Sequence, residues 1–165
     1  MDMDDDFVRQ VYVASYRRLV GQLYGVCGDL GEAEDAVQEA FARAIQHERK
    51  FRRTDNPEAW LRTVAVNLSR TRWRRRVMGD RLQRKAHRTD VQPDLSPDHV
   101  ALMAALNRLP EAQRQVIALH HLADLPVHEV AVAVGAPVGT VKARLCRGRT
   151  TLAQLLNDRE EAHHA

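Results

Sequence analysis

Apolar residues recur every three or four positions along most of this chain, which is the spacing of one face of an α-helix. A first helix is predicted over residues 6–26, and Gly28 follows its last turn. Asp29, with Glu32 three residues later, is typical of a helix start and predicts a second helix that runs to about His47. We find no convincing β-strand alternation, so the predicted fold class is all-α.

Later start signals divide the chain into two parts. Asn56 followed by Pro57 predicts a third helix, because asparagine caps a first turn well and proline is tolerated at the first helical position. Between residues 89 and 97 the periodicity stops, and two prolines stand among small polar residues. We therefore predict two small helical domains, residues 1–88 and 98–160, joined by a short flexible linker over 89–97.

The last third of the chain predicts a helix-turn-helix. Residues 130–134 are apolar, Gly135 marks a turn, and a second helix rich in basic side chains follows. In this motif the first helix braces the second, and the N-terminal residues of the second enter the DNA major groove. With Val141 at the centre of the buried face, helical spacing places Leu145, Gly148 and Leu152 on the same side.

The opposite side of that second helix is the candidate DNA-reading face. Helical spacing puts Arg149 at its edge, where it suits a phosphate, and Arg144 on the flank nearer the core. The alternative interpretation is a helical hairpin with a basic exposed face. The residues on or near the reading face are Lys142, Ala143, Cys146, Arg147 and Thr150.

Charge is concentrated in one stretch of the first domain. Of the 25 Lys and Arg residues, 14 lie between Arg49 and Arg88, against three acidic residues in the same stretch. The basic loop at 51–56 precedes Trp60, and a cationic arm at 70–76 ends the third helix. Phosphate contacts together with base stacking would hold single-stranded DNA there, whereas the alternative is a solvated charged helix.

Several other classes of protein are disfavoured. The two cysteines have neither disulfide-framework nor metal-ligand spacing, and the acidic N-terminus is unlike a secretory signal. His128 and Glu129 begin an H-E-x-x-H pattern, but Val132 stands where the second histidine is required. We expect no metal, no cofactor, no enzymatic activity, no membrane insertion and a cytoplasmic location.

Four blocks of sequence carry a family resemblance. They are residues 28–41, which include Gly-Asp and Ala-Glu-Asp-Ala-Val-Gln-Glu-Ala-Phe, then 57–67, 106–119 and 139–147. Together they span nearly the whole chain in order. The sequence resembles bacterial RNA polymerase sigma factors of the extracytoplasmic-function group (group IV of the sigma-70 family), the compact type with only regions two and four.

The resemblance implies a function and a set of partners. The protein would bind core RNA polymerase at the largest-subunit clamp and the flap, open the −10 promoter element and read the −35 element. A probable anti-sigma factor would hold it, and it would associate with the nucleoid when bound to polymerase. The alternative is a stand-alone helix-turn-helix regulator that binds an operator as a dimer.

The resemblance also assigns residues. Docking on the polymerase clamp is assigned to Asp35, Gln38 and Glu39. Binding of the −10 element is assigned to Arg52, Arg53, Asn56, Asn67, Thr71, Arg74 and Arg75. Reading of the −35 element is assigned to Thr140, Lys142, Ala143, Cys146, Arg147 and Arg149. Thr71 stands where family members often have an acidic residue, which affects the preferred −10 bases.

Overall fold

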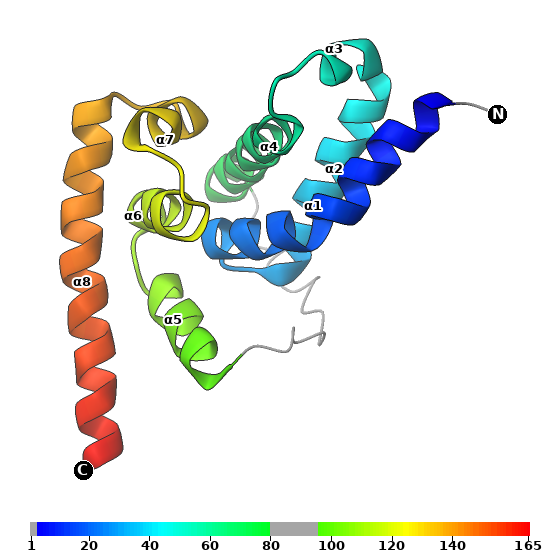
Figure 1. Cartoon of the computed structure of the whole chain (residues 1–165). Helices are drawn as coiled ribbons and strands as arrows, with labels where there is room; N and C mark the ends of the chain where they lie inside the picture. Colours follow the sequence, from blue (N-terminus) through cyan, green and yellow to red (C-terminus); the bar gives the residue numbers. More distant parts are fainter. Residues whose placement is uncertain (1–2, 80–95) are drawn as a thin grey trace. The chain divides into compact units, whose positions relative to one another are not determined.

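The computed structural model describes residues 3–79 and 96–165. Every regular element in these two ranges is a helix, so the predicted all-α fold class is confirmed (Figure 1). The chain divides into two compact units, Met1–Arg88 and Thr89–Ala165, and each is described by itself. Most of the predicted linker, residues 89–95, lies outside the described residues.

The first unit is a bundle of three long helices and one short one. Helices α1, α2 and α4 pack against one another, and α3 sits between α2 and α4 in the sequence (Figure 1). Its helices are α1 (Met3–Cys27), α2 (Leu30–Gln46), α3 (Glu48–Arg52) and α4 (Pro57–Gly79). Large side chains with almost no exposed surface fill its centre, among them Leu19, Leu23, Val26, Val37, Phe51, Leu61 and Val66.

Local capping sets two helix starts in this unit, as predicted. Gly28 has a φ of 74°, a left-handed conformation that favours glycine, and it separates α1 from α2. The Asp29 side chain then accepts a hydrogen bond from the backbone N–H of Glu32 at 2.9 Å. Asn56 Oδ1 does the same for the N–H of Ala59 at 3.1 Å, at the start of α4. Each such cap stabilises its helix by about 1 kcal/mol.

The predicted loop at 51–56 is partly wrong. Phe51 belongs to α3, and its side chain is completely buried, with its ring centroid 5.7 Å from that of Phe7. Burial of this ring stabilises an extra helical turn after α2. Only Arg53–Asn56 remain to connect α3 with α4.

The second unit is built around its last helix. Helix α8 lies alongside α5, α6 and α7 and is the longest helix of the unit (Figure 1). The elements are α5 (Pro97–Asn107), α6 (Glu111–Ile117), a π-helical turn η1 (Ala118–Leu122), α7 (Val127–Val134) and α8 (Val138–His164). Pro110 and Pro126 directly precede α6 and α7, and Ser96 caps α5 through the N–H of His99.

Gly148 provides a test of how tightly α8 packs against α6. A Cβ at this position would lie 2.9 Å from Ile117 Cγ1 and 3.5 Å from Gln113 Cβ. We expect Gly148→Ala to destabilise the second unit, because overpacking costs about 1–3 kcal/mol and the helix propensity of alanine returns only about 1 kcal/mol. Denaturant unfolding followed by circular dichroism measures this change.

The matched control is Gly21→Ala in α1, where nothing lies within 4 Å of an added Cβ. This control should be neutral or stabilising by up to about 1 kcal/mol, because alanine is the better helix former. Equal stability of Gly148→Ala and the wild type would show that moving Ile117 aside costs no more than the roughly 1 kcal/mol that alanine returns.

Candidate functional site

Helix α2 has one packed face and one exposed polar face. The residues that share one side of the helix, Ala33, Val37, Ala40, Phe41 and Ala44, are all buried. Asp35, Gln38 and Glu39 are exposed on the other side, so the structure brings these three predicted residues together. We call these three residues the α2 docking face.

Polar groups of the α2 docking face make weak contacts with neighbouring side chains of the first unit. Glu39 Oε1 lies 3.7 Å from Arg43 Nε, and both side chains are about half exposed. Such a surface ion pair is worth only about 0–1 kcal/mol. Gln38 Nε2 donates to the hydroxyl of Tyr16 on α1 at 3.3 Å. The carboxylates therefore stay accessible to a partner.

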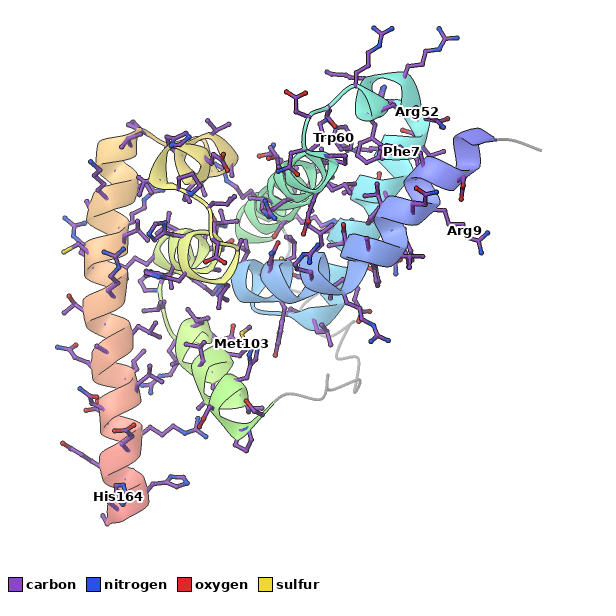
Figure 2. All side chains as sticks on the ribbon, viewed as in Figure 1. Phe7, Arg9, Arg52, Trp60, Met103 and His164 are labelled. Atoms are coloured by element: carbon purple, nitrogen blue, oxygen red, sulfur yellow. The ribbon has the colours of Figure 1, made fainter. Side chains whose placement is uncertain are left out.

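The basic segment before α4 is only partly open. Arg52, Arg53 and Asn56 are exposed, as expected of residues that contact DNA. However, Arg52 lies in α3 rather than in a loop. Its Nη2 is 2.9 Å from Glu48 Oε1, and its guanidinium lies 5.6 Å from the ring centroid of Phe7 (Figure 2). Arg52 thus has partners within its own unit.

The exposed face of α4 carries Asn67, Thr71 and Arg75 at four-residue spacing, which places them on one side of the helix. The Thr71 hydroxyl donates to the backbone oxygen of Asn67 at 3.0 Å. The side chain of Arg74, also predicted to bind the −10 element, lies outside the described residues, as does that of Trp73.

Trp60 belongs to the packing of this unit. It is half-buried, and its ring centroid lies 5.2 Å from that of Phe51 in a tilted arrangement. Figure 2 shows Trp60 near Phe7 and Arg52. The contact with Phe51 places Trp60 in the packing around the buried Phe51 ring.

One cation of the basic stretch has a structural role that sequence reasoning missed. Arg62 is 8% exposed, and its Nε donates to Gln22 Oε1 at 3.0 Å. Glu58 lies 3.8 Å from Arg62 and accepts two hydrogen bonds from Arg18 of α1, at 2.6 and 2.9 Å. These contacts join α1 to α4, so Arg62 does not contribute to a DNA surface. Only its neighbours in space reveal this role.

The second unit contains the predicted helix-turn-helix. Helix α7 ends at Gly135, whose φ of 67° is left-handed, and α8 begins three residues later at Val138. Val141, Leu145 and Gly148 are buried as predicted, whereas Leu152 is only half-buried. Residues of the candidate reading face that are exposed are Lys142, Ala143, Cys146, Arg147, Arg149 and Thr150, while Thr140 is half-buried.

Arg149 has a partner that the sequence did not predict. Its Nε donates to His121 Nε2 at 3.0 Å. The ring of His120 meets that of His121 edge-on at 4.8 Å, and His120 Nδ1 lies 2.7 Å from the backbone oxygen of Leu125. His120 is half-buried, whereas His121 is exposed.

The chain matches two family models. One is described as Sigma-70 region 2 and covers residues 11–77, and the other is described as Sigma-70, region 4 and covers residues 99–152. The chain is also 32% identical over 155 residues to the ECF RNA polymerase sigma factor EcfG of Rhodopseudomonas palustris, covering 92% of this chain and 86% of the relative. The chain belongs to the extracytoplasmic-function sigma factors of the sigma-70 family.

Further relatives agree with this assignment. This sigma factor is 30% identical over 173 residues to SigW of Bacillus subtilis, covering 95% and 88% of the two chains. The solved sigma factor RpoE of Bartonella quintana, in complex with the anti-sigma factor NepR, has a TM-score of 0.73 and 28% identity, with 92% and 97% of the chains covered. CnrH, solved with the cytosolic domain of CnrY, shares the fold at a TM-score of 0.63.

Membership of this group gives the protein its general function, which is to direct RNA polymerase to promoters. Within the described ranges of this sigma factor, no three His, Cys, Asp or Glu residues group as metal ligands would. None of the helices in those ranges is long and apolar enough to cross a membrane.

The His121–Arg149 pair in this sigma factor predicts a pH dependence. Partial burial, then the charges of Arg149 and His120, lower the pKa of His121 below its ordinary value. As the pH falls below about 6.5, the unfolded chain therefore binds a proton more readily than the folded one. Stability present at neutral pH is lost in that range, and because His121 is largely exposed the loss should be small.

Urea unfolding midpoints at pH 7.5 and pH 5.5 measure this effect in wild type and His121→Gln. The glutamine keeps an acceptor for Arg149 but does not titrate. We expect a smaller drop between the two pH values in the variant. Equal drops would show that His121 contributes nothing to the pH dependence.

Proposed function

We propose that this sigma factor binds core RNA polymerase through the α2 docking face, opens the −10 element with α4 and the segment before it, and reads the −35 element with α8. The observation that carries the proposal is the presence of two different exposed faces in one chain. One unit presents an acidic and amide face on α2, and the other presents Lys142 and Arg147 on a helix-turn-helix. A regulator that acts without polymerase needs only the basic face of the helix-turn-helix.

We assign region 2 to residues 1–88 and region 4 to residues 98–160. Reading of duplex DNA at −35 would fix the register of the protein, because base-edge contacts specify sequence while phosphate contacts position. Lys142 and Arg147 lie in the first turns of α8, which is the part of a recognition helix that enters the major groove. Ala143 has a small side chain between them, which allows close approach.

Opening of the −10 element would use α4. Unstacking a flipped base costs a few kcal/mol, so a sigma factor must recover that cost by holding the separated strand. The exposed residues Arg53, Asn67, Thr71 and Arg75 would contact that strand, together with Asn56 and Arg74. Arg52 would first have to leave Glu48, so we expect it to contribute less than Arg53.

The remaining partners follow from the same proposal. The largest-subunit clamp would receive the α2 docking face, and the flap would contact the second unit. An anti-sigma factor is a further proposed partner, supported by the solved complex of RpoE with NepR. The protein would act in the cytoplasm, on the nucleoid when bound to polymerase, and it would need no cofactor, because polymerase catalyses nucleotide addition.

Run-off transcription from fragmented genomic DNA tests the proposal, using bacterial core polymerase with and without the purified protein. Discrete new transcripts are expected, and their aligned start regions would give the −10 and −35 sequences. Absence of transcripts together with absence of comigration with core would refute the proposal. Operator binding by a dimer without polymerase would instead support the stand-alone regulator.

A further inference from the structure

Two tyrosines of α1 border the α2 docking face. Tyr12 and Tyr16 lie one turn apart, and their rings stack with centroids 4.7 Å apart and an interplanar angle of 22°. The ring of Tyr12 also meets that of Phe41 edge-on at 5.0 Å. Phe41 is 5% exposed and Tyr12 is 41% exposed. The stacked pair therefore contacts the buried side of α2 through Phe41, and the other side of Tyr12 is open to solvent.

This arrangement fixes the hydroxyl of Tyr16. A tyrosine ring has few rotatable bonds, and a stacked neighbour on the same helix restricts them further. The hydroxyl accepts a hydrogen bond from Gln38 Nε2 at 3.3 Å. Gln38 follows Asp35 by three residues and precedes Glu39 by one, so the tyrosine hydroxyl contacts the middle of the docking face.

In the structure the Gln38 amide presents its nitrogen to the hydroxyl of Tyr16. A glutamine side chain carries both an acceptor oxygen and two N–H donors. Because the tyrosine takes the nitrogen end, the amide oxygen is directed away from it. The oxygen then joins the carboxylates of Asp35 and Glu39, and all three groups accept hydrogen bonds from cationic or N–H donors.

We propose that Tyr16 is a positioning residue for polymerase docking, which holds the Gln38 side chain in place on the α2 docking face, and that Tyr12 holds the Tyr16 ring in place. The inference rests on the proposed function of the α2 docking face. Because Tyr16 already holds the Gln38 side chain, binding of a partner does not have to pay the entropy of ordering it. Such preorganisation increases affinity. The partner surface that fits is rich in Arg or Lys.

The first test is Tyr16→Phe, which keeps the ring stack and removes only the hydroxyl. We expect the Kd for core polymerase to rise about 3–10-fold, in the range of one lost hydrogen bond to a partner-facing group. The melting temperature should not change. The matched control is Tyr24→Phe, which removes a hydroxyl from another half-buried tyrosine of α1 and should leave the Kd unchanged.

The second test is a double-mutant cycle with Gln38→Ala. If Tyr16 acts through Gln38, then Tyr16→Phe should have no further effect on the Kd in the Gln38→Ala background. An unchanged Kd for Tyr16→Phe alone, or the same fold-change in both backgrounds, would overturn the positioning role and leave the docking face intact. An unchanged Kd for Gln38→Ala as well as for Asp35→Ala and Glu39→Ala would overturn both.

Discussion

Simultaneous replacement of Asp35, Gln38 and Glu39 by alanine is expected to weaken binding to core RNA polymerase by at least about 100-fold, since a few interface residues carry most of a binding energy. All three side chains are exposed and none fills the core, so the fold should remain intact. Alanine is also a good helix former, so α2 should be retained. Fluorescence anisotropy with labelled protein and core polymerase measures the Kd.

The matched control for this variant is Asp6→Ala with Gln10→Ala. These residues also place an exposed carboxylate and an exposed amide on a helix of the same unit, far in sequence from the α2 docking face. The Gln10 amide donates a hydrogen bond to the Asp6 carboxylate at 3.0 Å. The control should bind core like the wild type. Wild-type affinity in the triple variant would contradict the assignment of α2.

Lys142→Ala with Arg147→Ala is expected to spare binding to core polymerase and to impair −35-dependent initiation. Each basic contact to a base or phosphate is worth about 1–3 kcal/mol, so we expect specific duplex binding to weaken by about 100-fold or more. Both side chains are exposed on α8, whereas Val141 and Leu145 are buried, so their removal should not disturb packing. Binding to the −35 duplex found by run-off transcription, and transcription from that promoter, are the measurements.

Salt dependence provides an independent check on the same variant. Loss of contacts to phosphates lowers the slope of the logarithm of affinity against the logarithm of salt concentration. The control is Arg108→Ala with Arg159→Ala, which removes the same net charge from exposed positions in the same unit. If this control lost as much affinity as Lys142→Ala with Arg147→Ala, net charge would explain the effect rather than a reading face.

Helix starts and exposed faces could be predicted from the sequence because both depend on local chemistry. Asp29 and Asn56 cap the first turns next to them, and this requires nothing from elsewhere in the chain. Likewise, the helical period alone turns Gln38 away from Ala33, Ala40 and Ala44 once α2 is recognised as a helix.

Contacts between elements could not be predicted in this way. Phe51 forms an extra helical turn because Phe7 and Trp60, from other helices, surround its ring. His121 meets Arg149 across 28 positions of sequence. In the same manner, Arg62 counts as one more basic residue in the sequence, and only the position of Gln22 shows that it is part of the interior.

Helix α2 can accept few substitutions during evolution. Its packed side is made largely of glycine and alanine, which already fill the least volume, so almost any substitution there would enlarge a side chain in a close-packed interior. The buried residues are Gly31, Ala33, Ala36, Val37, Ala40, Phe41 and Ala44. Since we propose that the opposite side contacts polymerase, a change of partner affinity would have to arise at the flanks of α2 or on the neighbouring helix α1.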